Sequence, residues 1–162
     1  MGAAGPAGVV IVARSPSDPN GKTRLLRHVS VGRAGALRRA LLLDTMDVVR
    51  SLENIIPWLA FSPSSATAEM AEASDGAFHL LPQRPGNLGD RLIGVFDHLF
   101  LAGYAGALII GSDLPTLRSD FLRSALRALA AQGDPLVLGP AEDGGYYLVA
   151  LRTPHPELFE EI

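Results

Sequence analysis

Cysteine is absent from all 162 residues of the sequence. Disulfides and thiolate metal sites are therefore excluded, and the composition is compatible with a reducing compartment. The chain also lacks any stretch close to the roughly 20 apolar residues that a membrane-spanning helix needs. Residues 1–8 have neither the basic start nor the long apolar run of a secretion signal. We therefore expect a soluble, cytoplasmic protein.

An excess of positive charge is missing as well. The formal net charge is −3 and the pI is about 5.8, whereas proteins that bind nucleic acids or membrane surfaces usually carry a basic face. Lysine is almost absent, since Lys22 is the only lysine among 14 basic residues. The charge balance argues against nucleic-acid and membrane partners and leaves small molecules as the ligands to consider. Nothing in the sequence indicates the oligomeric state.

Apolar residues are abundant. They make up 48% of the sequence, enough for one substantial core and most simply for a single domain over residues 1–162. Short apolar segments alternate along the chain with segments of helical spacing, which predicts an α/β fold with a mostly parallel sheet covered by helices. The expected strands are 8–13, 55–61, 78–81, 107–110, 135–140 and 146–151, and the expected helices are 35–52, 66–73, 87–102, one capped by Ser119 and ended by Gly133, and one starting at Pro156.

One carboxylate follows the most apolar of these strands. Residues 107–110 predict a buried strand, which Gly-Ser-Asp-Leu-Pro ends at residues 111–115. Ligands of open α/β sheets bind just outside the carboxyl ends of strands, so Asp113 is a candidate metal ligand or substrate-orienting group. The alternative is an aspartate that only caps the turn before Pro115. The sequence leaves both interpretations open.

Three cations flank the loop after the first strand, namely Arg14, Lys22 and Arg24. Phosphate oxygens need directed cationic donors, so this cluster predicts a site for a di- or triphosphate, with a solvated basic loop as the alternative. The segment 21–23 matches the end of a P-loop motif. However, Pro16 stands where that motif has its first glycine, and proline has no amide hydrogen to donate. A P-loop is therefore the weaker interpretation.

Two further loops carry groups that suit ligands. In the first, Gln83 offers paired donor and acceptor groups and Gly86 permits the close approach of a flat ligand, before Asn87 caps a helix. These features suit the edge of a nucleobase, and they also occur in turns without ligands. The second loop, residues 141–145, contains Asp143 and suits a metal or a hydroxyl donor. An ordinary hairpin turn accounts for it equally well.

Four segments together resemble a known family. They are residues 13–16 continuing to 22–25, Gln83 with 86–91, 111–115, and 139–148. In this order and spacing they resemble the GT-A-type transferases called radical-SAM/selenodomain-associated transferase 1, which are themselves similar to 2-phospho-lactate guanylyltransferases. The resemblance implies a nucleotide-diphospho-sugar transferase fold, a three-layer α/β/α sandwich with a mostly parallel mixed sheet, and a divalent metal.

The resemblance also implies roles for individual residues. The cations after the first strand would hold nucleotide phosphates, the segment 83–87 would line the base, and the loop 143–147 would face the acceptor. Asp113 would bind Mg²⁺ or Mn²⁺, with Asp143 as a base or second ligand. The implied donor-binding set is Arg14, Lys22, Arg24, Gln83, Gly86, Asn87, Ser112 and Gly144, and the implied metal and catalytic set is Asp113 and Asp143.

The chain departs from the family pattern in three places. Arg14 stands where the family usually has lysine, an exchange that keeps the cation. Pro19 stands near a family glycine, and the glycine of this chain is displaced to Gly21. The family also continues beyond the equivalent of residues 159–162, so the resemblance implies one GT-A-like domain that lacks the family's C-terminal segment.

The function implied is a metal-dependent transferase with a nucleotide-activated donor, first of all a glycosyltransferase acting on a small-molecule acceptor. Glycosyltransferases of this fold often carry Asp-x-Asp, whereas this chain has Asp113-Leu114-Pro115. A nucleotidyltransferase of guanylyltransferase type, acting on a phosphorylated small acid, is therefore an alternative, and a non-catalytic nucleotide-binding domain is another. No side chain is an evident nucleophile, so we expect direct displacement by an oxygen of the acceptor.

Overall fold

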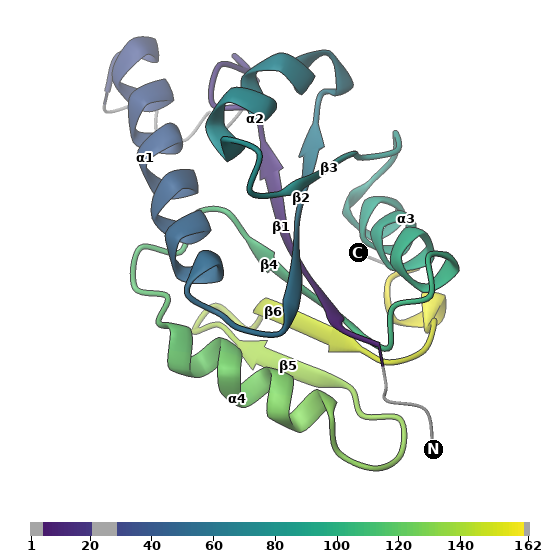
Figure 1. The fold of residues 1–162 in the computed structure, drawn as a ribbon. Coiled ribbons are helices and arrows are strands. Elements are labelled where there is room, and N and C mark those ends of the chain that lie inside the picture. Colours follow the sequence, from purple (N-terminus) through teal and green to yellow (C-terminus); the bar gives the residue numbers. More distant parts are fainter. Residues whose placement is uncertain (1–4, 21–28, 161–162) are drawn as a thin grey trace.

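The computed structural model describes residues 5–20 and 29–160. Within these ranges strands and helices alternate as predicted (Figure 1). The strands are β1 (Ala7–Arg14), β2 (Ile55–Ser62), β3 (His79–Pro82), β4 (Ala107–Gly111), β5 (Val137–Pro140) and β6 (Tyr146–Leu151). The α-helices are α1 (Val31–Arg50), α2 (Thr67–Ser74), α3 (Leu88–Leu101) and α4 (Ser119–Leu129), and the 3₁₀ turns are η2 (Ser64–Ala66) and η3 (Pro156–Leu158).

The described strands form one six-stranded mixed sheet in the order β3-β2-β1-β4-β6-β5. The pairs β2–β3, β1–β2 and β1–β4 are parallel, whereas β6 is antiparallel to both β4 and β5. The predicted mixed, mostly parallel sheet is therefore confirmed, with the parallel strands β3, β2, β1 and β4 on one side and the antiparallel β6 on the other. Its parallel part directs the ends of β1, β2, β3 and β4 to one edge.

Both faces of the sheet are covered (Figure 1). On one face, side chains such as Ile11 and Leu108 pack in one cluster with residues of α1, α2 and α4. On the other face, Val10 and Ile109 pack with α3 and with Phe159 near the end of the chain. Successive strand residues point to opposite faces, which explains why a doubly covered strand reads as a continuous apolar run.

Several helix ends differ from the predicted ones. The first helix begins at Val31 rather than Gly35, because Ser30 caps it and its side chain accepts from the Arg33 amide. The residue that caps α4 is Arg118, so Ser119 is the first residue of the helix, which ends before Gly133 at Leu129. The described part of the tail forms only the short η3 turn. Apolar spacing locates helices better than their first and last turns.

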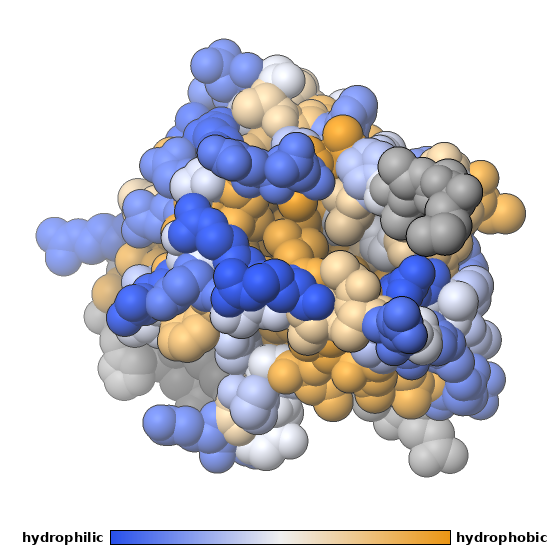
Figure 2. All heavy atoms as spheres, turned by 60° about the horizontal axis from the view of Figure 1, so that its bottom comes forward, coloured by the Kyte–Doolittle hydropathy of each residue, from blue (hydrophilic) through white to orange (hydrophobic). Residues whose placement is uncertain are grey.

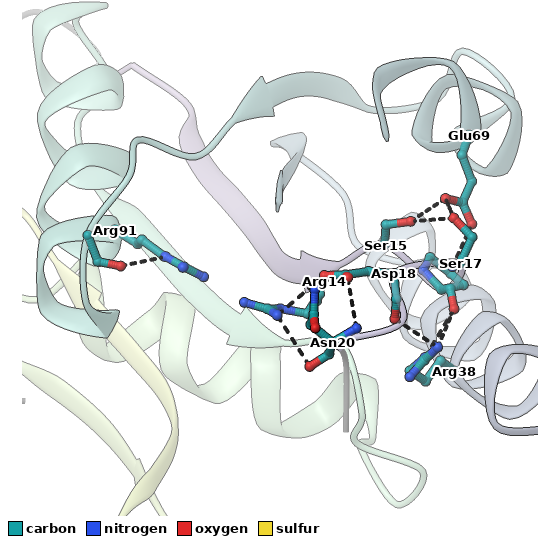
Figure 3. A network of polar contacts seen from close by, with 10 residues as sticks. Arg14, Ser15, Ser17, Asp18, Asn20, Arg38, Glu69 and Arg91 are labelled. Atoms are coloured by element: carbon teal, nitrogen blue, oxygen red, sulfur yellow. Dashed lines mark hydrogen bonds and ion pairs between the residues drawn. The ribbon is translucent and has the colours of Figure 1, made fainter. Parts of the chain in front are cut away.

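One charged side chain of α1 is buried. Charged residues of an amphipathic helix usually face water, but Arg38 has only 8% of its surface exposed. It points instead toward the loop that follows β1 (Figure 3).

None of the described helices is long and apolar enough to cross a membrane.

Candidate active site at the carboxyl edge of the sheet

The register of the strands brings the predicted site segments to one edge. Val12 of β1 lies beside Gly111, the last residue of β4. Two residues further on are Arg14, which ends β1, and Asp113, which lies just beyond β4. Ile110 pairs with Leu148 of antiparallel β6, which brings the turn between β5 and β6 to the same edge. Gln83 comes directly after β3, which also ends there. This edge, residues 14–20, 83–87, 111–115 and 141–145, is called the carboxyl edge below.

Arg14 lies at the end of β1 with an exposed side chain. Its Nη1 atom lies 3.3 Å from the Asp18 carboxylate and donates to the backbone oxygen of Asn20 at 3.4 Å. The Asp18 carboxylate also accepts from the Asn20 amide at 2.9 Å. These contacts curl residues 14–20 into a compact loop, and they hold a guanidinium at the carboxyl edge. The cations Lys22 and Arg24 lie outside the described residues.

Glu69 of α2 holds the same loop from one side (Figure 3). Its carboxylate accepts from the Ser17 amide at 3.1 Å and from the Ser17 hydroxyl at 2.7 Å, and the Ser15 hydroxyl donates to it as well. Burial alone would raise the pKa of Glu69, but the hydrogen bonds from Ser15 and Ser17 outweigh it and lower the pKa. The carboxylate is therefore ionised and bonded at neutral pH.

Arg38 of α1 holds the loop from the other side. Its Nε and Nη2 atoms donate to the Pro16 oxygen at 3.1 and 2.6 Å, and Nη2 also donates to the Asp18 oxygen at 3.2 Å. The Ser15 amide meanwhile donates to the Ser62 oxygen of β2 at 2.8 Å. The loop after β1 is thus hydrogen-bonded to α1, α2 and β2, and these bonds fix its conformation at the carboxyl edge.

The second predicted loop leads into α3. Gln83 donates through Nε2 to the Ala60 oxygen at 2.9 Å, so its amide group is fixed against the end of β2. The predicted cap is confirmed, because Asn87 Oδ1 accepts from the Asp90 amide at 2.8 Å while Asp90 Oδ2 accepts from the Asn87 amide at 3.0 Å. Gly86 has a φ of 134°, a conformation that favours glycine. These bonds give Asn87 a structural role whether or not it also touches a ligand.

A further arginine comes from the first turn of α3. Arg91 donates through Nε to the Gly86 oxygen at 3.1 Å, which fixes the plane of its guanidinium. In Figure 3 the ends of the Arg91 and Arg14 side chains point toward one another from α3 and from the end of β1. Two guanidinium groups that converge favour an anion between them. Arg91 was not among the predicted site residues.

Ser112 and Asp113 follow β4 directly, and the Asp113 side chain is exposed. Its Oδ1 atom would lie 3.4 Å from a Cβ built on Gly111, so the carboxylate turns back toward the end of its own strand. A carboxylate at this place agrees with the predicted metal or substrate role. Its interactions leave the turn-capping interpretation open.

The predicted acceptor loop is a tight hairpin turn. The Ala141 amide donates to the Gly145 oxygen at 2.9 Å and the Gly144 amide to the Ala141 oxygen at 3.1 Å. Asp143 Oδ1 accepts from the Gly145 amide at 3.1 Å, and Gly144 has a φ of 88°. Burial raises the pKa of Tyr146, the first residue after the turn. One oxygen of Asp143 thus stabilises the turn, so the hairpin interpretation accounts for the contacts of this residue.

The described residues contain no group of three or more histidines, aspartates or glutamates that could form a metal cage. Magnesium in phosphate sites usually takes only one or two carboxylates, and the phosphates and water supply its other oxygens. Asp113, with Asp143 as a second carboxylate on the same edge, fits that smaller set. The donor chemistry therefore suits a metal that arrives with a phosphate ligand.

One cavity lined by described residues lies away from the carboxyl edge. It has about 600 Å³ and opens at the opposite edge, between the starts of β1, β2 and β4 and the end of α4. Figure 2 brings this side of the molecule forward and shows apolar surface in hollows between polar side chains. A smaller pocket of about 260 Å³ lies between β3 and α3 and is lined by Gln83, Arg84 and Arg91 among others. The polar groups and the strand ends favour the carboxyl edge as the site.

Comparison with known proteins begins with one family model. Residues 45–162 match the family DUF2064, described as uncharacterized protein conserved in bacteria. No curated protein matches the chain.

Several solved structures share this fold, and one of them resembles it closely. A proposed nucleotide-diphospho-sugar transferase from Desulfovibrio desulfuricans G20 has 26% identity and a TM-score of 0.86 over 96% of this chain and 68% of that one. The predicted nucleotide-diphospho-sugar transferase fold is therefore confirmed. A CMP:2-keto-3-deoxy-manno-octonic acid synthetase complexed with CTP has 13% identity and a TM-score of 0.55 over 96% of this chain and 76% of that one. Rv0371c of Mycobacterium tuberculosis H37Rv in complex with manganese has 20% identity and a TM-score of 0.59 over 98% and 77%. The last two likenesses concern the fold alone.

Proposed function

This chain belongs to the DUF2064 family of bacterial proteins, and we propose that it is a metal-dependent transferase that takes a nucleotide-activated donor. The observation that carries the proposal is the register of β1 and β4, which brings Arg14 and Asp113 to the ends of two neighbouring strands. A cation and a carboxylate at such an edge suit a diphosphate and its metal. The likeness to a proposed nucleotide-diphospho-sugar transferase supports the donor class.

Different residues of the carboxyl edge would bind the metal, the phosphates and the base of the donor. Asp113, with Asp143 as second ligand, would hold Mg²⁺ or Mn²⁺, which when bound would neutralise charge on the leaving phosphate. Arg14, together with Lys22 and Arg24, would bind the phosphate oxygens and stabilise the same charge. Gln83, Gly86 and Asn87 would line the base. Ser112 and Gly144 would complete the donor site, and the acceptor's own oxygen would displace the leaving group.

Glycosyl transfer to a small-molecule acceptor is the first form of this proposal. The second form is nucleotidyl transfer, which is favoured by the absence of a second aspartate in Asp113-Leu114-Pro115 and by the likeness to a CMP-sugar synthetase fold. Membership in the radical-SAM/selenodomain-associated transferases and a cytoplasmic location belong to the same proposal. The products distinguish the two forms, because nucleotidyl transfer releases pyrophosphate and glycosyl transfer releases a nucleotide.

The first experiment is a thermal-shift screen of nucleoside triphosphates and nucleotide-sugars with MnCl₂ or MgCl₂. A ligand that binds only the native state raises the unfolding temperature by mass action. We expect a shift that requires both nucleotide and metal. Mass spectrometry of reactions with small hydroxy acids and sugars would then identify the product class.

The variant that tests the site is Asp113→Asn, which removes one charge at constant shape. We expect metal-dependent nucleotide binding, measured by calorimetry, to weaken at least about tenfold, because even the partners of metal ligands act on that scale. Asp44→Asn is the matched control, since Asp44 is an exposed carboxylate on α1 and does not belong to the carboxyl edge. Equal binding by the Asp113 variant and the native chain would contradict the role of Asp113.

A further inference from the structure

The loop after β1 is held by a carboxylate from a distant helix. Glu69 stands 54 residues from Ser15 in the sequence. Its carboxylate accepts three hydrogen bonds from this loop, one from the Ser15 hydroxyl and two from the amide and hydroxyl of Ser17. Ser15 is buried, with 1% of its surface exposed, and its hydroxyl also lies 3.0 Å from that of Ser17. The carboxylate therefore closes a small network with Ser15 and Ser17 of this loop (Figure 3).

The network fixes backbone as well as side chains. The Ser17 amide donates to Glu69, and the carbonyls of Pro16 and Asp18 accept from Arg38. The peptide group between Pro16 and Ser17 is thus bonded from both sides, its amide by α2 and its carbonyl by α1, and the Asp18 carbonyl is bonded by α1 as well. A loop held in this way has little freedom to reorient. This matters for the residue at its start, because Arg14 is bonded within the same loop to Asp18 and Asn20.

We propose that Glu69 is a positioning residue of the carboxyl edge: by binding Ser15 and Ser17 it fixes the loop 15–18 and so directs Arg14 toward the diphosphate of the donor. This inference rests on the proposed function for the identity of the ligand, whereas the anchoring of the loop does not. The lowered pKa of Glu69 agrees with it, since the anchor is charged at neutral pH.

Glu72 supplies a matched control from the same helix. It lies three residues after Glu69 and meets Arg39 of α1 at 3.2 Å in an exposed ion pair. It has the same charge and lies on the same helix, but its ion pair joins α2 to α1 and does not involve the loop. Glu69→Gln and Glu72→Gln therefore separate the loop anchor from a general contribution of α2 to stability.

The first measurement is the hydrogen exchange rate of the Ser17 amide, followed by NMR at constant pH. Glu69→Gln is expected to raise this rate by about tenfold or more, as the loss of a charge-assisted hydrogen bond predicts. Glu72→Gln is expected to leave it unchanged. An unchanged Ser17 rate in folded Glu69→Gln would overturn the proposal.

The second measurement is calorimetric titration with inorganic pyrophosphate in the presence of MnCl₂. Pyrophosphate represents the diphosphate that nucleoside triphosphates and nucleotide-diphospho-sugars share. Glu69→Gln should weaken this binding by about tenfold, and Glu72→Gln should not. Faster Ser17 exchange with unchanged pyrophosphate affinity would overturn the positioning role. If the native chain binds neither pyrophosphate nor nucleotides, the proposed function fails, while the Ser17 rate still decides whether Glu69 anchors the loop.

Ser17→Ala is the milder variant should Glu69→Gln not fold. It removes only the hydroxyl that donates to Glu69 at 2.7 Å and keeps the backbone amide in place. We expect a smaller loss of pyrophosphate affinity in the same direction. Ser65→Ala, an exposed position in η2, is its control, and equal affinity in the two serine variants would overturn the proposal.

Discussion

Gly86 is the position where backbone conformation and packing together demand one residue type. Its φ is 134°, and a Cβ built there would lie 2.4 Å from Asp90 Oδ2, inside the capping box of α3. We expect Gly86→Ala to lower the free energy of unfolding by about 1–3 kcal/mol, the range for a strained backbone. Urea denaturation of the ligand-free protein measures this.

Gly32 provides the comparison for that prediction. It lies in the first turn of α1, and a Cβ built there would have no atom within 4 Å. Gly32→Ala should leave stability unchanged or raise it by up to about 1 kcal/mol, because alanine is the better helix former. Equal destabilisation by the two alanines would contradict the role assigned to Gly86.

Single residues differ in how far the sequence revealed them. Asp113, Arg14 and Asn87 were predicted because each is marked by its neighbours: a strand end, a Pro-rich loop or a capping spacing. Glu69 was missed, because its partners Ser15 and Ser17 lie 54 and 52 residues away. Arg91 lies within a motif of the predicted second loop, but nothing local indicates that its side chain points toward Arg14.

Among the elements, α3 has the clearest local start signal. Asn87 and Asp90 exchange bonds between side chain and backbone in both directions. Asn87→Ala should therefore cost about 1 kcal/mol of stability, the usual value of an N-cap, whereas Asn87→Asp should retain most of it. Thermal unfolding without ligands measures the cap alone, and a loss as large for aspartate as for alanine would contradict the capping role.

Element types were predicted well, and the exposure of single positions less well. Period-two and helical spacing located the described strands and α-helices, because burial imposes those periods on the sequence. A charged residue on an amphipathic helix usually faces water, yet Arg38 is buried. Phe121 is an apolar residue of α4, yet half of its surface is exposed. The packing partner of a helix, which spacing does not identify, decides such cases.

At the scale of the whole molecule, a charged cluster joins the segment before β5 to the end of the described chain. His155 lies with one ring nitrogen 2.8 Å from Asp134 and with the other 2.8 Å from Glu157. The Asp134 and Glu157 carboxylates accept hydrogen bonds from the protonated ring and so raise the pKa of His155. Hydrogen bonds from Thr153 and His155 lower the pKa of Asp134, and that from His155 lowers the pKa of Glu157.

This cluster should stabilise the fold in a limited pH range. Because the pKa of His155 is raised in the folded protein, its contribution to the free energy of unfolding is fully present below the ordinary pKa of 6.5. That contribution is lost as the pH rises through the folded pKa. Because the pKa values of Asp134 and Glu157 are lowered, their contributions to stability are present above the ordinary values of 3.8 and 4.5 and are lost as the pH falls through the folded pKa values. His155→Gln should therefore lower the melting temperature most between about pH 4.5 and 6.5 and least near pH 9.

Melting curves of native and variant protein across that range provide the check. His98→Gln is the control, because the His98 ring packs against Trp58, at 5.2 Å between ring centroids, rather than against a carboxylate. A His155 effect of the same size at pH 5.5 and pH 9 would contradict an electrostatic contribution from the cluster.

The sequence by itself determined the α/β class, the order of the elements and the carboxylate after β4, because burial and turn geometry act on neighbouring residues and leave a local pattern. The tertiary structure alone decided which strands are neighbours, that Glu69 and Arg38 hold the loop after β1, and that Arg91 points toward Arg14. Those contacts join residues tens of positions apart, and only the packing of helices on the sheet brings such residues together. The proposed role of Glu69 is therefore one that no local pattern predicts.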